Sequence, residues 1–325
     1  MTAPPRALVT GVTGQDGWYL SELLLSDGYQ VFGLVHGGDD APAPDGVTVV
    51  SGDLADTAAV QAAVDQARPD EVYNLAAVSS VALSWQRPML TAEVTGLGLL
   101  RVITAVSKFS ERRGRPSRIV QASSAEMFGE AAGPQTEQTP IAPVTPYGAA
   151  KAFAHQLAHV YRGAGVSVST AILYNHESPR RPESFVARKI TRTVAQIARG
   201  EADRLPIGNL EARRDWGFAG DYARALQLIG RHPVADDFII ASGESRSVAD
   251  FIATAFRRVG VTDWRAFVDV DPGYLRPADP PDQHGDSSKA RRELGWCPSK
   301  SFEDMVNEMV DADLRLIDSP PPPTG

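Results

Sequence analysis

A tyrosine and a lysine stand four residues apart in the segment Tyr147-Gly-Ala-Ala-Lys151. Residues at this spacing share one face of a helix, so the phenol and the ammonium would lie close together. A nearby ammonium favours the phenolate, which would let Tyr147 take a hydroxyl proton near neutral pH. Ser123 and Ser124 follow a short apolar run and could hold the same hydroxyl. Taken alone, the pair is also typical of an exposed helix surface.

Three glycines recur at a spacing of three between an apolar run and a helical pattern. Glycine at such points lets the backbone turn tightly and approach a pyrophosphate, whose charge a helix N-terminus favours. A strand before the loop and a helix after it are the context that this dinucleotide fingerprint requires, whereas a plain tight turn is the alternative. We therefore expect cofactor contacts from Gly11, Thr13, Gly14, Gln15, Asp16 and Gly17.

Two later strand ends offer further cofactor contacts. Asp53 and Leu54 follow the third expected strand, where a carboxylate could lie beside the adenine, although a surface turn is the alternative. Leu75, Ala76 and Ala77 end the fourth strand with small side chains. Small side chains suit a ligand that lies over the end of a strand, and packing is the other explanation for them.

The elements that must position these residues alternate in type. Strands that alternate with helices of about ten or more residues imply a parallel sheet covered on both faces. The predicted fold class is α/β, a Rossmann-like doubly wound parallel sheet. Strands are expected at 6–10, 30–35, 47–51, 71–75, 118–122 and 167–174, and helices at 18–27, 57–67, 91–109 and 146–163.

The alternation weakens after residue 174, where the chain becomes rich in loops and proline. We expect a dinucleotide-binding domain over 1–174, with returns from the later chain, and a smaller mixed substrate-binding region over 175–317. Consecutive prolines cannot continue a helix or a central strand, so 318–325 is predicted to be a disordered tail. Helices of the second region are expected at 185–199, 220–230, 248–259 and 302–316.

Composition narrows the class of protein. The chain has 325 residues, with 32 Lys and Arg against 40 Asp and Glu, a net charge of −8 that argues against a dedicated nucleic-acid binder. Cys297 is the single cysteine, so an intrachain disulfide and a cysteine-rich metal site are excluded, and no metal is expected. The sequence contains no run of about 18 apolar residues, so we expect no membrane-spanning helix. The start lacks the apolar stretch of a signal peptide, so we expect a cytoplasmic protein.

The combined motifs resemble those of the extended short-chain dehydrogenase/reductase family, and within it the GDP-mannose 4,6-dehydratases. The glycine loop, the strand-end serine and the Tyr-x-x-x-Lys motif occur in the family order, and the resemblance covers nearly the whole chain. Its more specific segments lie in the second half. The segments that carry it are TGVTGQDGWYL (10–20), PDEVYNLAA (69–77), QASSAEMFGE (121–130), PYGAAK (146–151), YNHESPRR (174–181), FVARKITR (185–192), GNLEARRDWGFAGDY (208–222), LRPAD (275–279) and LGWCPSKSFEDMVNEMV (294–310).

The resemblance implies a lyase whose catalytic residues are Ser124, Glu126, Tyr147 and Lys151. In that chemistry Tyr147 takes the proton of the sugar 4-hydroxyl while hydride moves from C4 to the nicotinamide. The new ketone acidifies the C5 proton, Glu126 removes it, and water leaves C6. Hydride then returns to C6, so the cofactor is tightly held and regenerated in each turnover. A reductase or epimerase needs no such carboxylate, which makes Glu126 the diagnostic residue.

The resemblance also implies a binding site for a GDP-sugar. Arginine presents a planar fork that suits phosphate, and several basic residues crowd the second region although the chain is acidic. Arg181 is expected to bind the cofactor or to support its loop. The substrate contacts implied are Ser79, Ser84, Asn175, Lys189, Arg214 and Arg276.

One segment departs from the family pattern. His36 and Gly37 stand where the family carries two arginines for the 2′-phosphate of NADP, and Asp39 and Asp40 follow them. The resemblance implies NADP, whereas these residues make NAD at least competitive. The loop after them is also short for reaching another subunit, so a homodimer through helices 91–109 and 146–163 is favoured over a tetramer.

Two alternatives stay open. A GDP-sugar 4-oxidase, epimerase or reductase would share the fold and release its product earlier, but would not need Glu126. A catalytically silent nucleotide sensor would need neither Ser124, Tyr147 nor Lys151. The exact sugar is also open.

Overall fold

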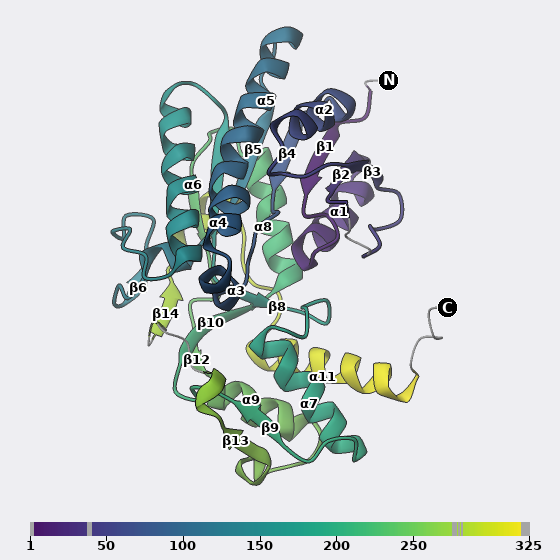
Figure 1. The fold of residues 1–325 in the computed structure, drawn as a ribbon, viewed down its shortest axis with the longest axis vertical. Coiled ribbons are helices and arrows are strands. Elements are labelled where there is room, and N and C mark those ends of the chain that lie inside the picture. The colour runs from purple at the N-terminus through teal and green to yellow at the C-terminus, as the bar shows by residue number, and fades with distance from the viewer. Residues whose placement is uncertain (1–2, 38–40, 275–277, 279, 281, 320–325) are drawn as a thin grey trace.

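Seven parallel strands form the central sheet of the computed structural model, which describes residues 3–37, 41–274, 278, 280 and 282–319. Their order is β11-β7-β5-β4-β1-β2-β3, and every adjacent pair is parallel, as the alternating sequence predicts (Figure 1). The strands are β1 (Arg6–Thr10), β2 (Gln30–Val35), β3 (Thr48–Ser51), β4 (Glu71–Asn74), β5 (Arg118–Ser124), β7 (Val168–Leu173) and β11 (Asp237–Ile240).

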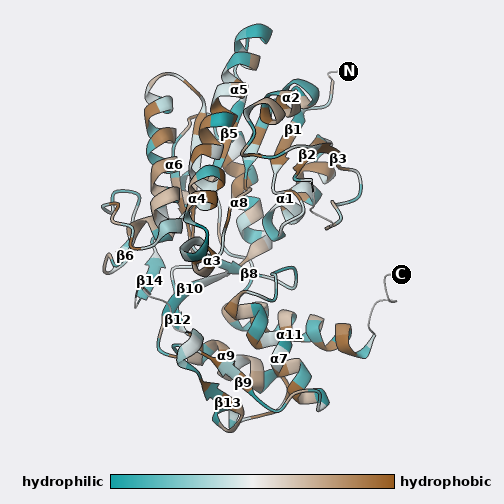
Figure 2. Ribbon diagram, in the orientation of Figure 1, coloured by the Kyte–Doolittle hydropathy of each residue, from teal (hydrophilic) through white to brown (hydrophobic). Residues whose placement is uncertain are grey.

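Helices cover both faces of this sheet, which confirms the doubly wound α/β class. On one face, Val64, Ile103 and Ala158 from three helices pack against strand residues such as Leu8. On the other face, Leu24 and Leu226 pack against a second set. Figure 2 shows the resulting apolar interior of the sheet between more polar outer helix surfaces. The first set of helices is α2 (Thr57–Ala67), α5 (Leu97–Arg113) and α6 (Pro146–Gly163), and the second is α1 (Gln15–Ser26) and α8 (Ala219–Arg231).

The smaller region lies below the sheet in Figure 1 and has its own apolar core. A mixed sheet in the order β12-β10-β14-β6 connects it to the larger region, and β8 pairs with β10. Strands β9 and β13 form a separate parallel pair. The elements are β6 (Pro134–Gln135), β8 (Asn175–Glu177), α7 (Val186–Arg199), β9 (Leu205–Ile207), β10 (Arg213–Phe218), β12 (Ser245–Ser247), α9 (Val248–Arg258), β13 (Val268–Val270), β14 (Asp282–Gly285) and α11 (Phe302–Asp318).

The chain returns to the larger region after residue 174. Strand β11 pairs with β7 at the edge of the central sheet, and α8 packs against the same core as α1. Helix α10 (Ser288–Leu294) contributes Ala290 to that core. A cut at residue 174 therefore keeps six strands of the central sheet together but separates them from the seventh, β11, and from α8 and α10, which pack against the same sheet. Of the segment 318–325, Asp318 ends α11 and bonds Arg199, while residues 320–325 lie outside the described residues.

The helix expected at 91–109 is part of a longer helical run. It comprises α4 (Pro88–Thr91), a π-helical segment (Ala92–Gly96) and α5, and it follows α3 (Val81–Gln86). By length and composition alone, the run Pro88–Arg113 passes as a helix that could cross a membrane. Half of its most apolar stretch is buried, and its apolar side packs in the core with α2, which is equally typical of a core helix.

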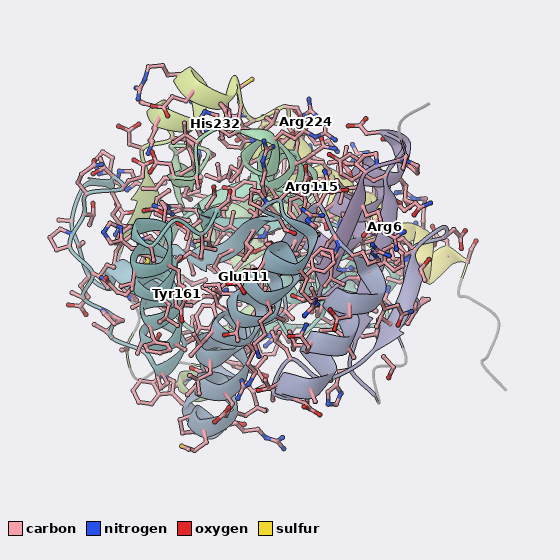
Figure 3. The ribbon with its side chains drawn as sticks, turned by 90° about the horizontal axis from the view of Figure 1, so that it is seen from above. Arg6, Glu111, Arg115, Tyr161, Arg224 and His232 are labelled. Carbon is pink, nitrogen blue, oxygen red and sulfur yellow. The ribbon has the colours of Figure 1, made fainter. Side chains whose placement is uncertain are left out.

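The edge at which the strands begin carries a cluster of charges, seen from above in Figure 3. Asp70 accepts hydrogen bonds from the Arg6 amide at 3.0 Å, from Arg113 at 3.1 Å and from Arg115 at 2.6 Å. These bonds fasten the beginnings of β1 and β4 to the end of α5. The opposite edge, where the strands end, is therefore the one left for ligands.

Candidate active site

A cavity of about 1010 Å³ lies at the carboxyl edge of the central sheet and extends to the second region. Strand order reverses between β1 and β4, which is where open parallel sheets bind ligands. Except for Ser84, and for Arg276, which lies outside the described residues, every site residue expected from the sequence lines it. Those residues are Gly11, Thr13, Gly14, Gln15, Asp16, Gly17, His36, Asp53, Leu54, Leu75, Ala76, Ala77, Ser79, Ser124, Glu126, Tyr147, Lys151, Asn175, Lys189, Arg181 and Arg214.

The glycine loop has the geometry that a pyrophosphate requires. Gly11 has φ +69°, and a Cβ there would lie 2.9 Å from the amide nitrogen of Ala76. A Cβ on Gly17 would collide with the carbonyl of Gly11, so α1 can start close under the loop only with glycine there. Gly14 is the N-cap of α1 and contributes no side-chain cap. The helix N-terminus therefore presents its amides and its partial positive charge to the cavity.

A threonine joins the first strand end to the fourth. Thr10 donates to Oδ1 of Asn74 at 2.8 Å and accepts from the amides of Leu75 and Ala76, each at 3.0 Å. The small residues after β4 are thus held beside the glycine loop. Their position fits a ligand that runs over both strand ends.

His36 and Asp53 lie together at the ends of β2 and β3. The imidazole Nε2 is 3.3 Å from Oδ2 of Asp53, and Oδ1 accepts from the amide of Ala55 at 2.8 Å. In this fold the end of the second strand faces the adenosine ribose of the dinucleotide. Asp39 and Asp40 lie outside the described residues. Among the described residues, the imidazole of His36 and the carboxylate of Asp53 line this end of the cavity.

Tyr147 is buried at the start of α6 and hydrogen bonds with Ser124 at the end of β5. Burial raises the pKa of the phenol well above its usual range. The hydrogen bond from Ser124 and the charge of Arg181 lower it, while Glu126 and Asp16 raise it further. Ser124 thus lies beside the phenol, but the lowered phenol pKa expected from Lys151 is not seen in the protein alone.

The side chain of Lys151 explains this difference. Its Nζ donates to the carbonyl of Ala122 at 2.6 Å and lies 5.7 Å from the centre of the Tyr147 ring. The lysine is only 3% exposed, and burial lowers its pKa to about 8, with Asp16 acting in the opposite direction. Burial is therefore the largest influence on the pKa of both the phenol and the ammonium.

Glu126 follows Ser124 in a short 3₁₀ turn (Ala125–Phe128). Its amide donates to Oγ of Ser124 at 3.3 Å, and its side chain lines the cavity. A Cβ on Gly148 would collide with the carbonyl of Glu126, so the glycine after Tyr147 allows this turn to approach the start of α6. The sequence places a carboxylate, a hydroxyl and a phenol within one corner of the cavity.

Ser84 does not reach the cavity. It is fully buried in α3, where its hydroxyl donates to the carbonyl of Val81 at 2.7 Å and accepts from the amide of Tyr147 at 3.2 Å. Both hydrogen-bonding functions are used inside the protein. The expected substrate contact is therefore not supported by its position, and Ser84 instead orients the first turn of α6.

Two residues of β8, His176 and Glu177, line the cavity although the sequence did not mark them as site residues. Nε2 of His176 is 2.9 Å from Oδ2 of Asp16, and Nε of Arg181 is 3.1 Å from Oε2 of Glu177. Burial raises the pKa of Asp16, but the charges of His176 and Arg181 bring it down to about 2. His176 and Glu177 lie inside the segment 174–181, which carries the family resemblance. That resemblance was the signal in the sequence that could have marked them as site residues.

Two cations from the second region face the other end of the cavity. Lys189 lies on α7 with its Nζ 3.3 Å from the centre of the Tyr274 ring. Among the described residues, none accepts a hydrogen bond from this buried ammonium. Arg214 is anchored more firmly, because its Nη1 donates to the carbonyls of Arg213 and Pro280, each at 2.7 Å. This end of the cavity fits an anion.

Comparison with known proteins identifies the family. A sequence model described as GDP-mannose 4,6 dehydratase matches residues 8–309. The chain belongs to the GDP-mannose 4,6-dehydratase family. GDP-mannose 4,6 dehydratase 1 of Arabidopsis thaliana is 44% identical over 95% of this chain and 90% of its own length. GDP-mannose 4,6 dehydratase of Homo sapiens is 37% identical over 97% and 93%.

A solved structure places the fold in a wider group. UDP-glucose 4-epimerase of Thermus thermophilus, in complex with NAD, has a TM-score of 0.83 and 26% identity, over 95% of this chain and 98% of that one. The family membership and the Rossmann-like fold predicted from the motifs are both confirmed.

Proposed function

We propose that this protein is a GDP-mannose 4,6-dehydratase, a hydro-lyase that converts GDP-mannose to the 4-keto-6-deoxy sugar. One observation carries the proposal beyond family membership. The cavity brings Glu126 together with Ser124, Tyr147 and Lys151, so a second acid–base group stands beside the hydroxyl-oxidising group. An oxidase, epimerase or reductase of this fold would have no use for that carboxylate.

Each catalytic residue has a separate role in the proposed reaction. A bound nicotinamide dinucleotide supplies a hydride acceptor and, when oxidised, a positive charge that favours the phenolate. Tyr147 accepts the proton of the 4-hydroxyl, which Ser124 orients through its own hydroxyl. The ketone at C4 acidifies the C5 proton, which Glu126 removes. The same carboxyl group then donates a proton to the leaving C6 hydroxyl, because one carboxylate can serve both steps by changing its protonation state. Return of the hydride to C6 and of a proton to C5 completes the 4-keto-6-deoxy sugar.

The cofactor and the substrate occupy opposite ends of the cavity in this proposal. The glycine loop and the N-terminus of α1 hold the pyrophosphate of the dinucleotide, with Arg181 beside it. Asn175, Lys189 and Arg214 hold the GDP-sugar, and Ser79 contacts its hexose. The protein acts in the cytoplasm and neither spans a membrane nor binds nucleic acid.

Mass spectrometry of the products tests the function. The protein should convert GDP-mannose to a product lighter by one water, and should leave UDP-, CDP- and TDP-hexoses unchanged. A product of unchanged mass would indicate epimerisation. A product lighter by two hydrogens would indicate oxidation alone. Tight GDP binding without turnover would favour the silent sensor. Each of these three results would reject the proposed dehydration.

Removing the ammonium of Lys189 should weaken substrate binding. In Lys189→Met the apolar stem is retained and the charge is lost, so a charge-assisted bond to the diphosphate disappears. We expect GDP affinity to fall by roughly 10- to 100-fold, equivalent to about 1.5–3 kcal/mol. Titration calorimetry with GDP measures this. Lys108→Met, on the exposed surface of α5, is the matched control, and equal GDP affinity in both variants would place Lys189 outside the substrate site.

The cofactor should include NAD rather than NADP alone. The carboxylate of Asp53 beside His36 repels a 2′-phosphate, and two arginines that would attract one are replaced by His36 and Gly37. We expect the mass of the cofactor extracted from purified protein to reveal NAD. His36→Arg should shift the preference toward NADP, and Asp53→Asn should do the same more weakly. Recovery of NADP alone from the unmodified protein would contradict this prediction.

A homodimer is proposed through the helices that cover one face of the sheet. Met89 is 75% exposed, Val160 is 63% exposed and Phe153 is 45% exposed, all on the helical run 88–113 or on α6. Pairing of these helices with a second copy would cover the apolar side chains. Light scattering should give twice the mass of one chain for the unmodified protein. Phe153→Asp should reduce the measured mass to that of a single chain. A stable tetramer, or a dimer unaffected by this substitution, would contradict the proposal.

A further inference from the structure

The loop between β8 and α7 joins the two ends of the cavity. Ser178 Oγ donates to Oε1 of Gln15 at 2.8 Å, which ties the loop to the first turn of α1. Three residues later, Arg181 extends into the cavity, where its guanidinium pairs with Glu177 and lies 3.7 Å from the centre of the Phe185 ring. The position of this loop therefore fixes a cavity cation relative to the glycine loop.

Arg188 fastens the loop from below. Its Nη1 donates to the carbonyl of Pro179, and to the carbonyl of Arg181 at 3.3 Å. The residue is 5% exposed and does not line the cavity. It cannot bind a ligand there, yet it bonds the backbone on both sides of Arg180. These two bonds restrain the path of the loop just where Arg181 leaves it.

Asp313 of α11 holds the guanidinium in this orientation. The carboxylate is fully buried, and its two oxygens accept from Nε of Arg188 at 3.0 and 3.1 Å, while Nη2 lies 2.8 Å from Oδ1. Oδ2 also accepts from Oγ1 of Thr191 at 2.8 Å. Because several atoms of the fork are engaged, the remaining Nη1 has one available direction, toward the loop.

We propose that Asp313 is a positioning residue for the reaction, acting through Arg188 on the 178–181 loop. The C-terminal helix thereby sets where Arg181 meets the bound dinucleotide, although Asp313 touches neither ligand. The effect on binding rests on the proposed function, whereas the effect on the loop does not. A buried ion pair is weak evidence for stability on its own, because a hydrophobic replacement is often equally stable. The pair serves to direct Nη1 rather than to stabilise the fold.

A double variant separates positioning from stability. Arg188→Leu combined with Asp313→Leu removes both buried charges together and fills the space with apolar atoms, so we expect a melting temperature near that of the unmodified protein. The carbonyls of Pro179 and Arg181 nevertheless lose their donor. Hydrogen exchange at the amides of Arg180 and Arg181, which both bond Ser178, should accelerate. The dissociation constants for NAD and NADP should rise about tenfold or more, as expected when a contacting group is misplaced.

Asp318→Asn is the matched control. Asp318 pairs with Arg199 across the same two helices, at 2.7 Å, but on the exposed surface and far along α7 from the loop. Asp318→Asn should change neither hydrogen exchange at Arg180 and Arg181 nor the affinity for NAD and NADP. Unchanged exchange and affinity in the double variant would overturn the inference. If the unmodified protein bound no dinucleotide, the proposed function would fail, and the exchange result alone would then decide whether Asp313 positions the loop.

Discussion

Tyr147→Phe should reduce turnover of GDP-mannose by roughly 10²- to 10⁴-fold, the usual contribution of a positioned proton acceptor. The substitution removes the one oxygen that can take the proton of the sugar 4-hydroxyl and leaves the ring in its buried place at the start of α6. Oxidation at C4 should fail, so the later loss of water should fail with it. The expected result is recovery of unchanged substrate, measured by mass spectrometry over time.

The control for this substitution lies on the same helix. Tyr161 is near the other end of α6, where Figure 3 labels it, and it does not line the cavity. Tyr161→Phe removes a hydroxyl of the same kind without affecting the site, and should retain full activity. GDP affinity should be equal in the two variants, because neither hydroxyl is expected to hold the nucleotide. Full activity in Tyr147→Phe would reject the short-chain dehydrogenase mechanism for this chain.

Glu126→Gln should abolish dehydration while leaving ligand binding nearly intact. The amide keeps the shape of the carboxylate and loses its basicity, so the C5 proton is no longer removed. Tyr147 and Ser124 remain in place, which confines the defect to the second half of the reaction. In deuterated water the unmodified enzyme should introduce deuterium at C5 of its product, whereas Glu126→Gln should release neither the dehydrated product nor labelled substrate.

A nearby carboxylate provides the comparison for Glu126. Glu130 is exposed, four residues along the chain, and does not line the cavity. Glu130→Gln should therefore dehydrate GDP-mannose at the normal rate. Tyr147→Phe and Glu126→Gln should also differ in the step that fails, since only Tyr147→Phe blocks the oxidation at C4. Normal label incorporation by Glu126→Gln would assign the C5 proton to another base.

The sequence predicts the central sheet well because its signals are local. Each early strand is a short apolar run, and each helix carries its own periodic apolar face, so the run 6–10 and the helix 57–67 were found with their bounds. The π-helical turn Ala92–Gly96 was not predicted, because its geometry depends on packing beside α6 rather than on propensity. Strand β11 was missed for a similar reason: it is four residues long and follows a region of weak alternation.

The site was predicted where motifs carry it and missed where distant residues meet. The glycine loop, Ser124, Glu126, Tyr147 and Lys151 are all in one cavity, as the motifs indicate. The ion pair of Asp16 with His176 joins residues 160 positions apart, and no spacing rule connects them. Burial was the other hidden quantity. It raises the pKa of Tyr147 and removes Ser84 from the surface, and neither effect can be read from residue types alone.

The pairing of β8 with β10 has a consequence for how the protein moves. Asn175 lies opposite Trp216 in this pair, and both residues line the cavity. Because this pairing makes β8 and β10 one unit, a hinge that opened the two regions would have to break the bonds that tie this unit to α1. His176 lies 2.9 Å from Asp16, and Ser178 donates to Gln15 at 2.8 Å. The cavity is therefore formed before any ligand arrives, and no affinity is lost to closing a cleft. Crystals that hold the two regions at a fixed separation should consequently still turn over substrate that diffuses into them.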